Sequence, residues 1–148
     1  MINLEQSELI KKLAESKKSP RLRAPFALSK DEDSVQVLYN PIQPLSYIRP
    51  HRHENPELWL GVAGRIALLT FNEEGSIRDK YMLSDNEFRM VEVPGNVYHT
   101  AFALEYDSIF CNISLGPFNP RAHKEFPEWA PNEGDEKVLT YIEGLLKI

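Results

Sequence analysis

Short apolar and alternating runs follow one another from about residue 24 to residue 116. Their sequences are VQVLY (35–39), LSYI (45–48), ELWLGV (57–62), RIALLTF (65–71), RMVEV (89–93), YHTAFAL (98–104) and SIFCNI (108–113). Residues that favour tight turns, such as Pro94-Gly95, separate several of the runs. Many short strands of this kind predict an all-β core, built as a barrel or a sandwich of antiparallel strands.

Apolar residues at helical spacing mark both ends of the chain. Within residues 1–19 the spacing continues up to Ser19-Pro20, through Leu9, Ile10, Leu13 and Ala14. Near the other end, a second helical stripe consists of Val138, Tyr141, Ile142 and Leu145. We therefore expect a short N-terminal helix and a short C-terminal helix that packs against the β core.

The segment GPFNPRAHKEFPEWAPNEG (116–134) joins the β core to the second helix and is rich in proline and aromatic residues. Its bulky rings predict an ordered segment that covers the barrel, not a free linker. The chain contains no internal repeat and no second zone of composition, so we expect a single domain over residues 1–148. In this division the N-terminal helix lies in 1–19, the β-barrel in 24–116, and the covering segment and C-terminal helix in 117–148.

The composition narrows the class of protein. With 42% apolar and 26% charged residues the chain is typical of folded, water-soluble proteins. A formal charge of -5 argues against a nucleic-acid partner, which requires clustered lysine and arginine. The first residues contain no secretory h-region, and no stretch approaches the roughly 20 apolar residues of a membrane span. We expect a cytoplasmic protein with no membrane partner.

The histidines supply the candidate chemistry. His51 and His53 lie two residues apart, so on an extended chain both imidazoles point to one face. Glu57 follows after a predicted turn at Asn55-Pro56 and can add a carboxylate, and His99 follows the Pro94-Gly95 turn. A lone His-x-His pair is often only two surface residues, so the prediction depends on the whole set.

Three imidazoles and one carboxylate form a mixed nitrogen and oxygen site. Such a set suits iron, manganese, nickel, cobalt or zinc better than calcium or magnesium. A lone Cys111 excludes an internal disulfide and a cysteine-rich zinc cluster, so the ligands of any metal are histidine and carboxylate. We expect one divalent transition metal, with coordination positions left open for water or a small molecule.

The spacing of these residues resembles the two signature motifs of the cupin superfamily. The first motif, His-x-His-x3-Glu-x6-Gly, corresponds to His51, His53, Glu57 and Gly64, and the second to Pro94-x4-His99. The chain departs from the usual motifs at Leu45, where glycine is common, and at Gly95, which follows the proline directly. All four ligand positions are kept. The resemblance implies a double-stranded β-helix, or jelly-roll barrel, with a metal bound by His51, His53, Glu57 and His99.

The flanking segments are similar to those of the WbuC-type cupin-fold metalloproteins, small bacterial proteins often encoded among O-antigen or capsule polysaccharide genes. The similar segments are SYIRPHRH, VPGNVYHTAFALE, GPFNP and EFPEWAPNEG. The similarity covers most of residues 19–145 and implies a role near bacterial surface polysaccharide metabolism. The wider cupin superfamily implies a homodimer.

Three further residues are candidates for substrate binding. If residues 45–53 are a strand, Tyr47 and Arg49 share the face of His51. Arg49 can then bind a carboxylate or phosphate of the ligand; alternatively it pairs with a structural acid such as Glu92 or Glu105. Trp59 shares the face of Glu57 and can stack on a sugar or aromatic ring, or it is a core aromatic.

Two other polar residues are weaker candidates. Asn112 is a candidate partner that orients a metal ligand, although strand hydrogen bonding explains it equally well. His123 lies outside the motifs and is better explained as a surface residue.

The pattern favours a metal-dependent enzyme, an isomerase, lyase or oxygenase, that acts on a small anionic or sugar-like molecule. The alternative is a non-catalytic module that binds a metal and a ligand. A third hypothesis, metal-free sugar-nucleotide epimerisation, gives no reason for a complete set of metal ligands.

Overall fold

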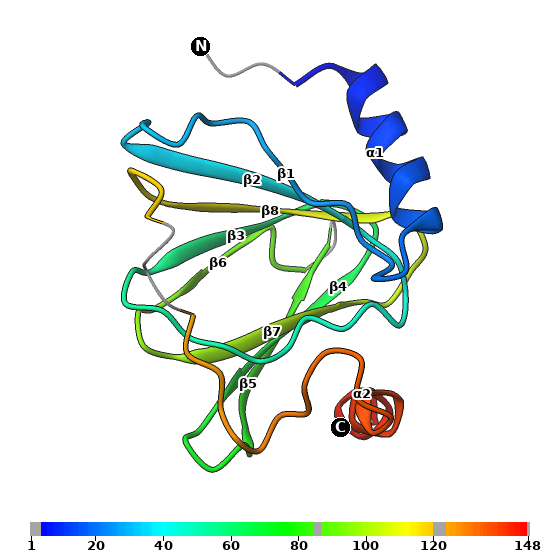
Figure 1. The fold of residues 1–148 in the computed structure, drawn as a ribbon, viewed down its shortest axis with the longest axis vertical. Helices are drawn as coiled ribbons and strands as arrows, with labels where there is room; N and C mark the ends of the chain where they lie inside the picture. The colour runs from blue at the N-terminus through cyan, green and yellow to red at the C-terminus, as the bar shows by residue number, and fades with distance from the viewer. Residues whose placement is uncertain (1–3, 85–86, 120–123, 148) are drawn as a thin grey trace.

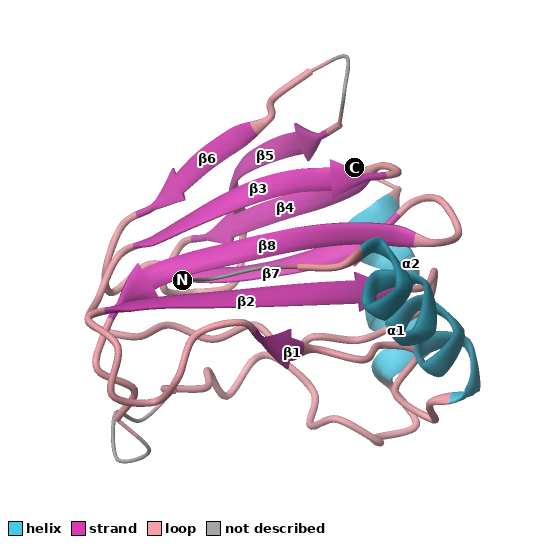
Figure 2. Ribbon diagram, turned by 90° about the horizontal axis from the view of Figure 1, so that it is seen from above, coloured by secondary structure: helices cyan, strands magenta, loops and turns pink. Residues whose placement is uncertain are grey.

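The computed structural model describes residues 4–84, 87–119 and 124–147. Its elements in chain order are α1 (Gln6–Lys18), β1 (Phe26–Ala27), β2 (Val35–Ile42), β3 (Glu57–Ala63), β4 (Ile66–Phe71), β5 (Ile77–Leu83), β6 (Met90–Val93), β7 (Tyr98–Ala103), β8 (Ser108–Leu115) and α2 (Val138–Leu146). The strands form two antiparallel sheets, one in the order β1-β2-β8-β3-β6 and one in the order β5-β4-β7. Figures 1 and 2 show the two sheets as facing layers with both helices outside them. The predicted all-β jelly-roll with short terminal helices is confirmed.

Six of the seven predicted strands correspond to strands of the structure, and one prediction is wrong. Residues 45–48 are not a strand, because Leu45 has a φ of 69° and Ser46 donates its N–H to the Gln43 carbonyl in a turn. The structure adds two strands, the two-residue β1 and β5; in β5 the exposed positions are Arg78 and Lys80, which alternate with half-buried residues. The polarity of β5 is typical of an edge strand with one solvent-exposed face. Such a strand contains no continuous apolar run from which it could be predicted.

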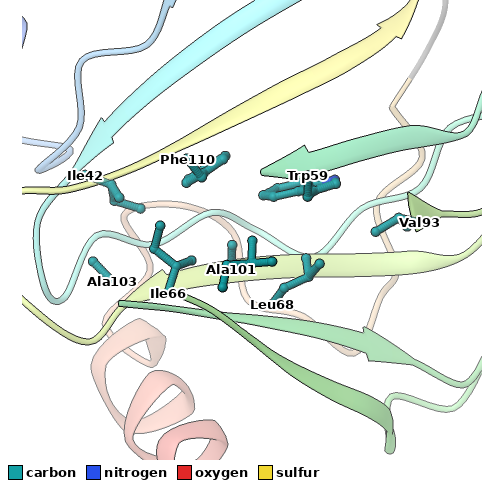
Figure 3. Close-up of a cluster of buried hydrophobic side chains, with 9 residues drawn as sticks. Ile42, Trp59, Ile66, Leu68, Val93, Ala101, Ala103 and Phe110 are labelled. Atoms are coloured by element: carbon teal, nitrogen blue, oxygen red, sulfur yellow. The ribbon is translucent and has the colours of Figure 1, made fainter. Parts of the chain in front are cut away.

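The core between the sheets consists of inward-facing side chains from both layers. Its members are Ile42, Trp59, Ile66, Leu68, Leu83, Val93, Ala101, Ala103 and Phe110. In Figure 3, Trp59 and Phe110 lie under the larger sheet, opposite Leu68 and Ala101 of the smaller one. The rings of Trp59 and Phe110 stack with centroids 4.7 Å apart. Interior positions alternate along the strands, so His99 of β7 shares the inward parity of Ala101.

A second apolar cluster covers the outer face of the smaller sheet. It contains Tyr47, Leu69, Phe71, Tyr98, Phe102, Ile142 and Leu145. Both faces of β4 and β7 are therefore buried. The predicted C-terminal stripe is confirmed, since Ile142 and Leu145 of α2 are buried in this cluster and Val138 and Tyr141 pack against it. At the other end, α1 forms where predicted, but Ile10 is 60% exposed, so its apolar stripe is only partly covered.

Residues 124–137, here called the covering segment, run along the outside of the barrel to α2 (orange in Figure 1). Polar contacts hold the segment at several points. The Trp129 indole donates to the Glu73 carbonyl at 2.9 Å, and the Tyr47 hydroxyl donates to the Pro131 carbonyl at 2.8 Å. Arg23 forms a 3.0 Å ion pair with Glu133. The segment is thereby fixed on the barrel.

Within the residues that the structure describes, no helix is long and apolar enough to cross a membrane.

Candidate metal centre

Three of the four predicted ligands lie together at one end of the barrel. The ligand nitrogens of His51, His53 and His99 all lie within 4.8 Å of one another. The backbone brings two of them side by side, because His51 and His99 form an antiparallel bridge with N–H···O=C distances of 3.1 and 2.9 Å. Asn96 then donates its N–H to the His53 carbonyl at 2.7 Å, which attaches the loop before β7 to the second histidine.

Each imidazole is held through its Nδ1 atom. His51 Nδ1 lies 2.9 Å from the Arg49 carbonyl, and His99 Nδ1 lies 2.9 Å from the Val97 carbonyl. His53 Nδ1 lies 2.7 Å from the carbonyl of Asn55. A carbonyl oxygen can only accept, so each Nδ1 carries the proton and each neutral ring presents an Nε2 lone pair. This is the tautomer that binds a metal through Nε2, with the second nitrogen oriented by an outer partner.

Glu57, the first residue of β3, borders the histidine cluster. Its carboxylate oxygens lie 3.2 Å from His53 Nε2 and 3.9 Å from His99 Nε2. Asn112 of β8 donates to the same carboxylate at 3.4 Å, and Asn40 of β2 donates to Asn112 at 2.9 Å. A short chain of buried amides therefore orients the carboxylate. The role considered for Asn112 agrees with this contact.

Burial keeps two of the imidazoles neutral. The pKa of His51 lies well below its ordinary value because of burial, reinforced by the charges of Lys124, His99 and His53. Burial likewise lowers the pKa of His99 to about 4. Both rings are uncharged at neutral pH, which is the state that a metal ligand requires.

His53 and Glu57 influence each other as a pair. The Glu57 carboxylate, 3.2 Å from His53 Nε2, raises the pKa of His53 because it stabilises the protonated ring, against the opposing effect of burial. Burial disfavours ionisation of Glu57, but the close approach of His53 and the positive charges of His53, His99 and Lys124 outweigh this and lower its pKa. Glu57 is thus a carboxylate at neutral pH and can serve as an anionic ligand.

The donor atoms fit a divalent cation. The Nε2 atoms of His53 and His99 are buried and accept no hydrogen bond from the described residues. Unpaired buried nitrogens that converge on one carboxylate are costly unless a cation lies between them. Three imidazole nitrogens and a carboxylate oxygen are the ligands preferred by the transition metals named above. The three-histidine cluster can therefore hold a divalent metal.

The side chains of Tyr47 and Arg49 make their contacts with the covering segment and with the outer apolar cluster. The expected strand alternation does not apply because residues 45–50 are not part of a strand. Tyr47 is buried in the outer apolar cluster, with its ring edge-on to Tyr141. Arg49 donates to the Pro127 carbonyl at 3.0 Å and to the Asn132 amide oxygen at 2.7 Å, and it lies over the Phe126 ring. Its partners are in the covering segment, and neither Glu92 nor Glu105 is among them.

Trp59 lies in the barrel core, next to the histidines. Its ring stacks on Phe110 and meets the His99 ring edge-on, with centroids 5.7 Å apart. Trp59 is therefore a core aromatic residue, which is the alternative to the prediction that it stacks on a sugar ring. The remaining histidine, His123, lies outside the described residues.

Sequence reasoning missed two side chains of the covering segment. An antiparallel bridge pairs Arg52 with Glu125, which places Lys124 and Phe126 beside the two histidines that flank Arg52. The Phe126 ring lies 6.1 Å from the ring of His51. The Lys124 charge opposes protonation of all three imidazoles: it adds to the effect of burial on the pKa of His51 and His99, and it works against the rise in the pKa of His53. The sequence around residue 124 does not predict its position beside the histidines, because Arg52 and Glu125, which pair there, are 73 residues apart in the chain.

Comparison with solved structures identifies the class of fold. CapF from Staphylococcus aureus, a capsular polysaccharide assembling protein, matches 74% of this chain with a TM-score of 0.63 and 20% identity; the match covers 33% of the CapF chain. KdgF from Halomonas sp. matches 66% of this chain and 82% of its own with a TM-score of 0.51 and 20% identity. The Mn(II)-containing oxalate decarboxylase of Bacillus subtilis matches 70% of this chain and 27% of its own with a TM-score of 0.53 and 13% identity.

These proteins define the cupin class of β-barrels, and the present chain has that fold. This chain thus spans only about a third of CapF. A search of curated proteins found no match. Residues 4–83 match the model of a protein family described as a domain of unknown function, DUF6016, and the chain belongs to that family.

Proposed function

We propose that the protein is a metal-dependent cupin enzyme that acts on a small anionic or sugar-like molecule. His51, His53, Glu57 and His99 are the proposed ligands. A bound divalent metal would polarise an oxygen atom of the substrate or supply hydroxide. The observation that carries the proposal is the cluster of three imidazoles, each with its Nδ1 atom fixed by a backbone carbonyl, next to the Glu57 carboxylate, which lies near His53 and His99.

The choice of metal follows from the ligand set. Neutral imidazoles with one carboxylate favour iron, manganese, nickel, cobalt or zinc. If the metal ion binds five or six ligands, the four ligands from the protein leave one or two coordination positions open. Substrate can enter at those positions, which is what separates a catalytic site from a closed structural one.

The wider role follows from resemblance. The flanking segments resemble the WbuC-type proteins, and CapF, which shares the fold, assembles capsular polysaccharide. We propose that the substrate belongs to bacterial surface polysaccharide metabolism and that the protein acts in the cytoplasm. Tyr47, Arg49 and Trp59 are proposed to support the substrate-binding site. A homodimer is the assembly expected of a cupin.

Metal analysis of the purified protein tests the first part of the proposal. The wild type is expected to contain close to one equivalent of a transition metal, and His51→Ala is expected to contain far less. Glu54→Gln, which changes an exposed carboxylate next to the site, serves as the matched control and keeps its metal. A wild-type protein that binds none of the five metals after dialysis against each would refute the proposal.

The competing function is a non-catalytic module in which the metal only anchors a ligand. To distinguish the enzyme from the binding module, the metal-loaded protein is incubated with a library of sugar acids and sugar nucleotides, and the conversion of each compound is measured. Turnover that is lost in His51→Ala supports the enzyme. Stoichiometric binding without turnover supports the module.

A further inference from the structure

The covering segment contributes side chains to the metal centre that the ligand motifs do not include. Arg52 and Glu125 exchange backbone hydrogen bonds of 3.0 and 2.9 Å. In an antiparallel pair, the residues on either side of such a bridge lie opposite each other. Lys124 is therefore opposite His53, and Phe126 is opposite His51.

Side-chain contacts fix which face each residue occupies. Arg52 and Glu125 form a 2.7 Å ion pair, and the Arg52 guanidinium lies over the ring of Tyr98, on the outer side of the barrel. Their neighbours point the other way, because side chains alternate along an extended chain. The 6.1 Å separation of the His51 and Phe126 rings agrees with this arrangement. Lys124 accordingly lies on the face of the imidazoles.

Among the basic residues that the structure describes beside the centre, Lys124 has the charge of Glu57 nearby but no hydrogen-bonded partner. Arg49 is bound to two acceptors of the covering segment, and Arg52 is bound to Glu73 and Glu125. In contrast, Lys124 forms no ion pair or hydrogen bond within residues 4–84, 87–119 and 124–147. Its side chain is exposed, so a ligand can reach it. The anion-binding role expected of Arg49 thus fits Lys124 better.

We propose that Lys124 binds the carboxylate of a small organic acid that occupies an open position of the metal. The inference rests on the proposed metal centre and names the substrate class for it. A carboxylate between the metal and an ammonium gains a charge-assisted hydrogen bond that a neutral metal ligand lacks. The Phe126 ring, 46% exposed, offers an apolar surface beside the same position for the rest of the acid.

The test uses the full-length protein loaded with Co²⁺, whose visible absorption reports both metal binding and ligand entry. Acetate is the anionic probe and imidazole the neutral one. Lys124→Gln is expected to bind acetate about tenfold more weakly while Co²⁺ and imidazole bind as in the wild type. Lys124→Arg is expected to retain most of the acetate affinity. Lys137→Gln, a change of an exposed lysine in the same segment, is the matched control and is expected to behave as the wild type.

The readouts separate the possible failures. Equal acetate affinity in Lys124→Gln and the wild type overturns the role of Lys124 and leaves the metal centre intact. Equal losses of acetate and imidazole affinity in that variant also overturn it, because they indicate a disturbed site instead of a lost charge. A wild type that binds Co²⁺ but not acetate refutes the substrate class alone. A wild type without a Co²⁺ spectrum refutes the proposed function and this inference together.

Discussion

Replacing Glu57 by glutamine removes one charge from the metal centre and almost no volume. The amide can still accept the hydrogen bond from Asn112, so the fold around the site is preserved. Glu54 lies three positions earlier, is exposed, and provides the matched change of Glu54→Gln. The pair of variants isolates the charge of one carboxylate.

The effect of Glu57→Gln on the Tm of the metal-bound protein can be estimated from the expected loss of metal affinity and from the chain length. Removing an outer partner of a metal ligand weakens binding by about 10- to 100-fold, and loss of an anionic ligand costs at least about the upper value. At a metal concentration of about 100 times the wild-type Kd, bound metal stabilises the wild type by about 2.7 kcal/mol and the variant by only about 0.4 kcal/mol. For 148 residues the unfolding entropy is about 0.3 kcal/mol/K. The Tm should rise by about 9 °C in the wild type and about 1 °C in Glu57→Gln.

Thermal unfolding with and without metal measures this difference for each variant against its own metal-free form. Any change that glutamine makes to the apoprotein therefore cancels. Glu54→Gln should show the full rise of the wild type. The reasoning fails if Glu57→Gln gains as much Tm from metal as the wild type, or if both glutamine variants lose the gain equally.

Three further predictions concern the surroundings of the centre. A Cβ at Gly95 would overlap the carbonyl oxygen of Glu54, so Gly95→Ala should displace the chain next to His53 and weaken metal binding about tenfold or more without touching a ligand, measured by metal titration; unchanged affinity would contradict the packing. In the metal-free protein, burial lowers the pKa of His99 to about 4, whereas an unfolded histidine titrates near 6.5. The unfolded state therefore takes up the proton first as the pH falls, and His99 should cost about 2 kcal/mol of unfolding free energy between pH 7 and pH 5 in urea titrations; equal or greater stability at pH 5 argues against it. Burial raises the pKa of the Cys111 thiol to about 11, so a disulfide reagent at pH 8 should label native protein slowly and urea-unfolded protein fully, and rapid native labelling would disagree.

The parts of the fold that sequence predicted are those encoded by local pattern. The runs that became β3, β4, β7 and β8 are apolar enough to be recognised alone, and β4 and β7 are buried on both faces. The two-residue spacing of His51 and His53 brings these two rings together, whereas His99 joins them through its bridge to His51, and its place among the ligands was predicted from the cupin motifs. Local periodicity also predicted α2, since its stripe has an apolar cluster to cover.

The sequence-based predictions were wrong or incomplete where the backbone conformation of a short segment, or a pairing between distant segments, determines the structure. Residues 45–50 are not part of a strand, so the alternation assumed for Tyr47 and Arg49 does not apply. Lys124 reaches the centre only through the bridge between Arg52 and Glu125, which no pattern near either residue encodes. The strand β5 was missed because three consecutive charged residues, 78–80, interrupt its apolar positions, and β1 was missed because it is only two residues long.

The carbonyl partners of the three histidines share one property with a consequence for how this site can change over evolution. Each Nδ1 contact joins a histidine to the backbone only two positions away, at Arg49, Asn55 and Val97. Backbone carbonyls are present whatever side chain occupies those positions. Side-chain substitutions at those three positions that preserve the backbone therefore keep the partner of each ring, and the surroundings of the site can change for a new substrate without a change in the ligand set.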